Sequence, residues 1–370
     1  MRIIFLGLSI TSSWGNGHAT TYRGLVRELS RRGHSVLFLE RDTPWYAGNR
    51  DLPEPPYGTT AIYTSVDELK TRFTGEVEGA DLVVVGSYVP EGVAVAEWVL
   101  DCGPGATAFY DIDTPVTLEK LGRGDYEYIS PDLIPRFDLY LSFNGGPVLE
   151  LLERQWGARR ATPLYCSADL DNYYPEPTHT QWDLGYMGTY SADRQPALDR
   201  LLLEPARTGR GRFVVAGPSF PSRIAWPANV ERIEHVAPGG HRAFYNGQRY
   251  TLNVTRAQMV SAGYAPSVRL FEAAACATPI ISDWWEGLDS FFVPGEEIFV
   301  AGSAEQILYY LWDVAAEKRR QTGLAARQRV LQEHSAAHRA AQLESYALEI
   351  LSPPGQNNGG QRRECESYGR

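Results

Sequence analysis

The sequence predicts an α/β protein made of two doubly wound, Rossmann-like domains that face each other across a cleft. The chain has 370 residues, which suits two domains of roughly 150–200 residues better than one core. Short apolar runs alternate with amphipathic segments in both halves. A polar, Pro-containing stretch at residues 173–177 separates the halves and predicts an interdomain linker.

The first half opens with a strand–loop–helix–strand unit. Residues 3–8 form a continuous apolar run, typical of a strand that is buried on both faces of a parallel sheet. A loop rich in Ser and Gly follows, then a helix over 19–32 and a strand over 35–40. The other elements expected in this half are strands at 82–85, 106–110 and 139–143 and helices at 93–100 and 148–155.

A second strand series begins at residue 184. Its expected strands are 184–188, 213–216, 232–235, 250–254 and 279–281, with helices at 304–316 and 336–350. We therefore expect an N-terminal domain over 1–172, a C-terminal domain over 178–335, a helix over 336–351 that can pack back on the N-terminal domain, and a disordered tail over 352–370. Open α/β sheets bind ligands at the carboxyl ends of their strands, so the cleft is the expected binding site.

Composition restricts the classes of partner. The chain is 43% apolar and 22% charged, as in folded globular proteins, and its net charge of −10 argues against nucleic acid or an anionic membrane as the main partner. The four cysteines are scattered without zinc-type spacing, which suits a reducing compartment. No stretch approaches the roughly 20 apolar residues of a membrane span. We expect a cytoplasmic protein without integral membrane contact.

The most informative stretch is residues 263–283, which reads as a loop, a small-residue helix and a strand. Ser267 suits a helix N-cap, so that the free N–H groups of the first turn, from Val268 onward, face the cleft and attract an anion. Arg269 adds positive charge beside that turn. Glu272 lies one turn further, where a carboxylate can accept both hydroxyls of a ribose. The alternative is a buried helix with a capping Ser and a surface Arg.

This segment resembles the nucleotide-sugar binding segment of GT-B glycosyltransferases, most closely that of the CgeB-like (spore maturation protein) group. The resemblance covers roughly residues 1–350. Further motifs that share it are 17–23, 185–190 with Arg194 and Pro196, 215–218, 253–256 and 287–297.

The resemblance implies a hexosyltransferase type of enzyme with a nucleoside-diphosphate sugar as co-substrate, and neither a metal nor a bound cofactor. The acceptor is a hydroxyl, or another nucleophile, of a small molecule, glycan or protein. The donor diphosphate is expected on the helix N-terminus, with Glu272 on the ribose. Many retaining relatives carry a second Glu eight positions earlier, where this chain has Tyr264. That departure puts their mechanism in doubt here and favours inversion.

The turn after the strand at 184–188 provides further donor candidates. Gly188 and Thr189 end the strand, and a Gly there lets the backbone approach a ligand. Arg194 is placed to pair with a phosphate oxygen. A tight turn with a solvated Arg remains the alternative.

The first loop of the chain offers a base. Gly15 and Gly17 permit positive φ and close ligand approach, and His18 follows them at the cleft end of the first strand. A His there can deprotonate an acceptor hydroxyl, and inverting GT-B enzymes often place a base His at about this location. Hydrogen bonding to the sugar, or capping of the helix, are the alternatives.

Two more loops reach the expected cleft. Asp111 and Asp113 follow a strand, and the Asp-x-Asp spacing alone suggests the metal site of GT-A enzymes. Because the surrounding chain resembles GT-B, we assign Asp113 to acceptor binding, orientation of His18 or an alternative base, with a simple Asp cap before Pro115 as the other option. Gly145 and Gly146 form a Gly-rich loop that faces the cleft or a turn that starts a helix.

Three other functions remain open at this point. A nucleotide-sugar epimerase can share the two-domain architecture, and a non-catalytic nucleotide-binding protein is a further option. A nicotinamide-dependent oxidoreductase would use Glu40, which ends the second strand as a ribose-binding acid should. The loop, however, reads Gly15-x-Gly17-x-x-Thr20 and lacks the third Gly of that fingerprint.

Overall fold

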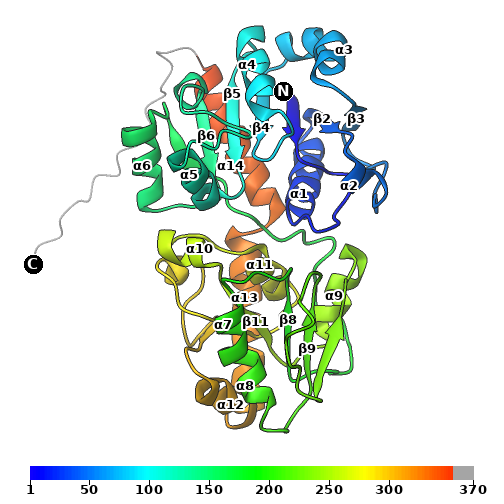
Figure 1. Ribbon diagram of the computed structural model, residues 1–370, viewed down its shortest axis with the longest axis vertical. Helices are drawn as coiled ribbons and strands as arrows, with labels where there is room; N and C mark the ends of the chain where they lie inside the picture. The colour runs from blue at the N-terminus through cyan, green and yellow to red at the C-terminus, as the bar shows by residue number, and fades with distance from the viewer. Residues whose placement is uncertain (353–370) are drawn as a thin grey trace, which may run out of the picture.

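Each half of the chain forms one parallel sheet covered by helices on both faces, and the computed structural model describes residues 1–352 of the chain (Figure 1). The strands of the first sheet are β1 (Arg2–Gly7), β2 (Ser35–Arg41), β3 (Thr59–Tyr63), β4 (Leu82–Gly86), β5 (Thr107–Asp111), β6 (Leu139–Ser142) and β7 (Ala161–Pro163). Their order in the sheet is β3-β2-β1-β4-β5-β6-β7. The helices of this half are α1 (His18–Arg31), α2 (Pro44–Ala47), α3 (Val66–Glu78), α4 (Gly92–Cys102), α5 (Thr114–Gly122), the 3₁₀ turn η1 (Ile134–Arg136) and α6 (Pro147–Trp156).

The apolar run of β1 explains the layering. Ile3 and Phe5 pack into the cluster under α1, whereas Ile4 and Leu6 pack into the cluster on the other face of the sheet. All four are buried because successive side chains of a strand point to opposite faces and helices cover both.

The second sheet has the order β10-β9-β8-β11-β12-β13 and is again parallel throughout. Its strands are β8 (Leu184–Met187), β9 (Phe213–Ala216), β10 (Val230–Ile233), β11 (Thr251–Asn253), β12 (Ile280–Ser282) and β13 (Phe299–Val300). The helical elements of this half are α7 (Gln195–Leu198), the π-helical turn η2 (Asp199–Leu203), α8 (Glu204–Ala206), α9 (Pro238–Asn246), α10 (Ala257–Ala262), α11 (Val268–Ala275), the 3₁₀ turn η3 (Leu288–Ser290), α12 (Ala304–Trp312) and α13 (Ala316–Glu333).

The chain crosses between the domains twice. After β7 it leaves the first domain, and Cys166, Ala168 and Tyr173 already pack in the core of the second. It returns after α13 through Ser335 into α14 (Ala336–Leu351). The two crossings pair with each other, since the Ala168 amide donates to His334 O (3.0 Å) and the Ala336 amide donates to Ala168 O (2.9 Å).

Helix α14 packs on the N-terminal domain beside α1 (Figure 1, orange-red beside blue). Ala340, Leu343 and Ala347 are fully buried in the same cluster as Ile3 and Phe5 of β1. The last helix of the described chain therefore completes the core of the first domain.

Two of the expected elements have different bounds, and others, such as α13, were not expected. The helix expected over 304–316 ends earlier, at Trp312, as α12, and α13 begins at Ala316 after Ala315, which adopts an extended conformation. The strand expected at 232–235 lies two residues earlier, as β10. The tail expected to be disordered falls outside the described residues, apart from Ser352.

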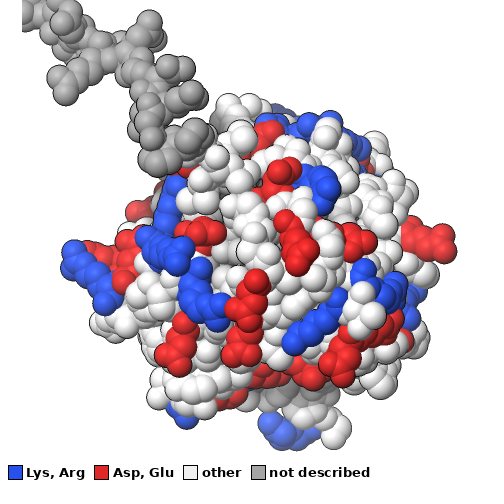
Figure 2. Space-filling view, turned by 90° about the horizontal axis from the view of Figure 1, so that it is seen from above, with Lys and Arg blue, Asp and Glu red and all other residues white. Residues whose placement is uncertain are grey.

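Charge is mixed on the face that Figure 2 shows, which is the end of the molecule at the top of Figure 1. Blue Lys and Arg side chains alternate there with red Asp and Glu side chains, without a broad basic area on this face. Within residues 1–352, no helix combines the length and the hydrophobicity that crossing a bilayer requires.

Candidate active site

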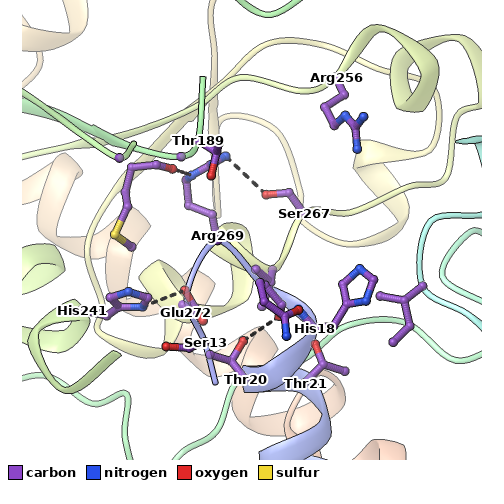
Figure 3. Close-up of a pocket in the computed structure, with 18 of the residues that line it drawn as sticks. Ser13, His18, Thr20, Thr21, Thr189, His241, Arg256, Ser267, Arg269 and Glu272 are labelled. Carbon is purple, nitrogen blue, oxygen red and sulfur yellow. Dashed lines mark hydrogen bonds and ion pairs between the residues drawn. The ribbon is translucent and has the colours of Figure 1, made fainter. Parts of the chain in front are cut away.

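A cavity of about 390 Å³ lies between the carboxyl ends of the two sheets. Its N-terminal wall comes from the loops after β1, β5 and β6, and its C-terminal wall from the loops after β8, β9, β10 and β11 and from the start of α11. The size suits a small-molecule ligand. Figure 3 shows His18, Thr20 and Thr21 of α1 facing Arg269 and Glu272 of α11 across this space.

The start of α11 forms part of the C-terminal wall. Ser267 occupies the N-cap position, as expected, but its hydroxyl does not cap the helix. Its Oγ donates instead to Asn253 Oδ1 at 3.0 Å. The first-turn N–H groups of α11, beginning with Val268, therefore receive no side-chain cap and lie beside the cavity that Ser267, Val268 and Arg269 line.

Three guanidinium groups, those of Arg194, Arg256 and Arg269, line the same cavity. Arg269 is only 8% exposed and is held by Met187 O (2.6 Å) and Asn253 Oδ1 (2.8 Å). Burial lowers the pKa of Arg194, and the charges of Arg269 and Arg256 lower this pKa further. In residues 1–352 neither Arg194 nor Arg269 forms an ion pair with a carboxylate within 4.0 Å, although the charge of Asp193 acts on Arg194.

Glu272 lies at another part of the cavity and is 3% exposed. Its Oε2 accepts a hydrogen bond from Tyr245 Oη at 3.0 Å and lies 4.0 Å from His241 Nδ1. Figure 3 shows the His241–Glu272 pair on the side of the cavity away from Arg256. A buried carboxylate held in this way is ready to accept hydroxyl donors from a ligand.

Gly188 and Thr189 both line the cavity. A Cβ on Gly188 would lie 2.8 Å from Arg269 Nη2 and 2.7 Å from Tyr186 Oη, so the missing side chain leaves room for Arg269. Arg194 donates to Thr189 O at 2.6 Å, and its Nε is buried without a hydrogen-bond partner in the described residues.

The first loop is anchored at its base by Glu40. This carboxylate accepts from the Ser9 hydroxyl, from the amides of Ile10 and Thr11 and from the Thr11 hydroxyl, at distances of 2.6–3.0 Å. At the tip, the Trp14 ring packs against His235 of the other domain, with 4.7 Å between ring centroids and a 50° angle between the ring planes. Gly15, with φ +59°, and Gly17 line the cavity, and a Cβ on either residue would point into open space.

His18 is the first residue of α1, after Gly17 at the N-cap. Its Nδ1 is buried and has no hydrogen-bond partner in the described part of the chain. Burial lowers the pKa of His18 to about 4, although the charge of Asp113 acts in the opposite direction. The imidazole is therefore neutral at neutral pH and can accept a proton.

Asp111 and Asp113 have separate environments. Asp113 lines the cavity, and its Oδ2 accepts from Tyr88 Oη (3.0 Å) and from Arg256 Nη1 (3.1 Å) of the other domain. Asp111 does not line it: this fully buried carboxylate accepts from Tyr140 and Thr117. Burial raises the pKa of Asp111 to about 6. Within residues 1–352 no cluster of three or more His, Cys, Asp or Glu side chains is arranged to hold a metal ion.

Gly145 and Gly146 do not line the cavity but receive Tyr264 from the other domain. The Gly145 amide donates to Tyr264 O at 3.0 Å. A Cβ on Gly146 would lie 2.3 Å from the Tyr264 ring, and one on Gly287 would lie 2.4 Å from it. We call Tyr264, Gly146 and Gly287 the tyrosine clasp. Tyr264, which stands where many retaining relatives carry a second Glu, therefore does not line the cavity.

The residues that the sequence alone did not identify include three that line the cavity, Arg256, His241 and His235, and Tyr88 beside it. Arg256 lies in the motif 253–256, three residues after the end of β11, and this position was the available signal. His241 and His235 follow β10, and Tyr88 follows β4 beside Asp113. For these three residues the spacing in the sequence gives no comparable signal, because loop geometry alone brings them together.

Comparison with known proteins agrees with the fold. Residues 194–345 match a family model described as glycosyl transferase-like. A sucrose-phosphate synthase from Thermosynechococcus elongatus is similar over 94% of this chain and 98% of its own, with 15% identity and a TM-score of 0.69. Anabaena HepE in complex with UDP-glucose is similar over 93% and 98%, with 13% identity and a TM-score of 0.69.

A third similar structure is an alpha-glucosyltransferase in complex with UDP-glucose and DNA containing an abasic site. It covers 94% of this chain and 99% of its own, with 11% identity and a TM-score of 0.68. No protein of curated function matches the chain by sequence. At these identities the similarity establishes the fold, so the expected GT-B architecture of two parallel-sheet domains is confirmed.

Proposed function

We propose that the chain is a GT-B glycosyltransferase that moves a sugar from a nucleoside-diphosphate donor to an acceptor hydroxyl, with His18 as the base and without a metal ion. The observation that carries the proposal is the pairing, in one interdomain cavity, of three guanidinium groups at an uncapped helix start with the buried carboxylate Glu272. Similar structures hold UDP-glucose or UDP as ligands.

The positive part of the cavity fits a diphosphate. Arg194 and Arg269 lack carboxylate partners in the described chain, and the α11 dipole directs its positive end to the same place. As the bond to the sugar breaks, negative charge develops on the diphosphate leaving group. Fixed donors and charges that are already in place stabilise this charge without a metal ion.

Glu272 fits the ribose. Tyr245 fixes one of its oxygens, and the carboxylate is buried, so hydrogen bonds from the ribose hydroxyls would form away from competing water. With its diphosphate at the guanidinium groups and its ribose at Glu272, the nucleoside diphosphate would lie along the C-terminal wall.

His18 stands on the opposite wall and would take the acceptor proton. An imidazole with a pKa of about 4 is a weak base in the empty site. A bound diphosphate brings negative charge into the cavity and raises the pKa of His18 toward neutrality. The base would therefore strengthen when the donor is present. The neutral His and the position of Tyr264 outside the cavity lining favour inversion.

The structure offers no support for the oxidoreductase alternative. Glu40, the residue that would bind the cofactor ribose, is fully buried in β2 and already accepts four hydrogen bonds from the first loop. Within the glycosyltransferases we propose a hexosyl donor and membership of the CgeB-like group, on the motifs at 185–190 and 253–256. Cys102, Cys166 and Cys276 are free thiols, which supports a cytoplasmic location.

The test is a thermal-shift screen of UDP-, dTDP- and GDP-sugars together with inorganic pyrophosphate. A bound donor raises the unfolding temperature by linkage. We expect Glu272→Gln to weaken binding of the preferred nucleoside diphosphate roughly 10- to 100-fold, since it loses charge-assisted hydrogen bonds, and to leave pyrophosphate binding unchanged.

Turnover then separates the remaining alternatives. Net release of nucleoside diphosphate with an acceptor present supports transfer, whereas sugar isomerisation without net release supports an epimerase. Binding without turnover under any acceptor supports a non-catalytic role. If none of the nucleotide sugars stabilises the protein, the proposed function is wrong.

A further inference from the structure

An ion pair joins the two domains inside the cavity. Arg256 directly precedes α10 in the C-terminal domain, and Asp113 directly precedes α5 in the N-terminal domain. Their contact, Nη1 to Oδ2, measures 3.1 Å. Both residues line the cavity that holds the donor candidates, so this contact forms within the ligand site and not on an outer surface.

Arg256 is incompletely satisfied by this contact. Its Nε is buried and has no hydrogen-bond partner among residues 1–352, as is true of Arg194 Nε in the same cavity. A buried donor without a protein partner is available to bind a ligand. The Arg256 side chain also keeps 37% of its exposure, so the guanidinium has room to move.

Asp113 has a second donor of its own. Tyr88 Oη donates to the same Oδ2 at 3.0 Å. Tyr88 adopts φ +63°, an uncommon conformation for an aromatic residue, and its ring lies 5.5 Å from that of His18. Asp113 thus stays hydrogen-bonded on the N-terminal wall, next to the base candidate, even when Arg256 leaves it.

Of the three cavity arginines, Arg256 is the one with a carboxylate partner in the described chain. An anion that enters the cavity meets two guanidinium groups without a carboxylate partner, those of Arg194 and Arg269, and a third, that of Arg256, which is paired with Asp113. The anion and Asp113 therefore compete for the charge of Arg256.

We infer that Arg256 is shared between Asp113 and the diphosphate of the bound donor. In the empty site Arg256 pairs with Asp113. When the diphosphate binds, Arg256 turns to a phosphate oxygen through its Nε and terminal nitrogens, and Asp113 keeps Tyr88 as its donor. The released carboxylate then accepts a hydrogen bond from the acceptor hydroxyl beside His18. The inference rests on the proposed function for the nature of the ligand, and it makes Asp113 an acceptor-positioning residue that is engaged only after the donor has bound.

The test is a double-mutant cycle on the affinity for inorganic pyrophosphate, measured by calorimetry. We expect Asp113→Asn to bind pyrophosphate several-fold more tightly than wild type, because Arg256 no longer has a competing partner. Arg256→Gln should bind it at least fivefold more weakly. In the Arg256→Gln background, Asp113→Asn should have no further effect. The matched control is Arg329→Gln, which removes an Arg paired with Glu297 outside the cavity and should leave the affinity unchanged.

A second variant covers the case in which Asp113→Asn fails to fold. Tyr88→Phe removes the other donor to Asp113 and leaves this carboxylate more dependent on Arg256, so pyrophosphate should bind more weakly than to wild type. Unchanged or weaker binding by folded Asp113→Asn, or additive effects in the cycle, would overturn the inference.

Different experimental results would contradict the two proposals. A pyrophosphate cycle that behaves as expected, in a protein that no nucleotide sugar stabilises, contradicts the proposed function alone. A nucleotide-sugar transferase whose cycle is additive contradicts the sharing of Arg256 alone.

Discussion

At the scale of single residues, the site contains fixed groups and responsive groups. Arg269 and Glu272 are buried and held by protein partners before any ligand arrives. His18 and Arg256 instead carry buried nitrogen atoms without partners in the described chain. Fixed groups give orientation at little entropic cost, whereas unpartnered groups are those whose environment a ligand changes.

The first prediction concerns His18. We expect His18→Gln to lower kcat by about 10²–10⁴-fold, the usual contribution of general base catalysis, while pyrophosphate affinity stays near the wild-type value. Steady-state kinetics with the preferred donor and calorimetry with pyrophosphate measure the two quantities. The matched variant His179→Gln alters an exposed His outside the cavity and should retain full activity. A kcat within threefold of wild type would remove His18 from the chemistry.

The sequence predicted which residues lie at the cleft better than it predicted which of their side chains face the cavity. Gly15, His18 and Asp113 follow strand ends, and strand ends of parallel sheets converge on one edge, so the sequence brings them to the cleft. Asp111 and Asp113 are indistinguishable in the sequence, yet one is buried against Tyr140 and the other faces the cavity. Which of the two faces inward depends on the loop conformation, which no local pattern encodes.

At the scale of elements, strands with continuous apolar runs were predictable, whereas the edge strands β3, β7 and β13 were not. Strand β3 is an edge strand whose residues are mostly half-buried, so its sequence lacks the apolar run that identified β1. Helix α13 was missed because it carries charged residues around most of its surface, with few buried positions. The formation of both elements depends more on packing against neighbouring elements than on their own sequence pattern.

The tyrosine clasp provides the second prediction. We expect Gly146→Ala to lower the unfolding temperature more than Gly103→Ala, although both glycines have φ +64°. Gly103 has open space around it, so Ala costs only backbone strain, about 1 kcal/mol. At Gly146 the new Cβ also meets the Tyr264 ring, which adds about 1–3 kcal/mol. In a Tyr264→Ala background the cost of Gly146→Ala should fall by this packing contribution, whereas the cost of Gly103→Ala should stay the same. The two costs do not become equal, because Gly146 has ψ −147° and Gly103 has ψ 50°. An unchanged cost of Gly146→Ala in that background would argue against the clasp.

At the scale of the whole molecule, buried histidines link stability to pH. Burial lowers the pKa of His18 to about 4 and that of His334 to about 3, from 6.5 in the unfolded chain. Between pH 6.5 and 4 the unfolded chain therefore binds protons that the folded protein does not. Stability is fully present above pH 6.5 and is lost as the pH falls through this range. Asp111, with its raised pKa, acts in the opposite direction below about pH 6.

The third prediction follows from this balance. We expect the free energy of unfolding, measured by urea titration, to fall from pH 7 to pH 4.5, because two histidines outweigh one aspartate. His18→Gln should flatten the curve, since this position then takes up no proton on unfolding. The exposed His179 shows no burial, so His179→Gln should keep the wild-type slope. A slope that is identical in all three proteins would show that His18 titrates normally when folded.

The return of the chain through α14 has a consequence for synthesis of the protein. Domains generally fold as units in the order in which the ribosome makes them. Here the first domain lacks Ala340, Leu343 and Ala347 of its core until α14, which follows the whole second domain, has been translated. The second domain is complete earlier, at the end of α13. The domain that is made first is therefore the one that finishes folding last.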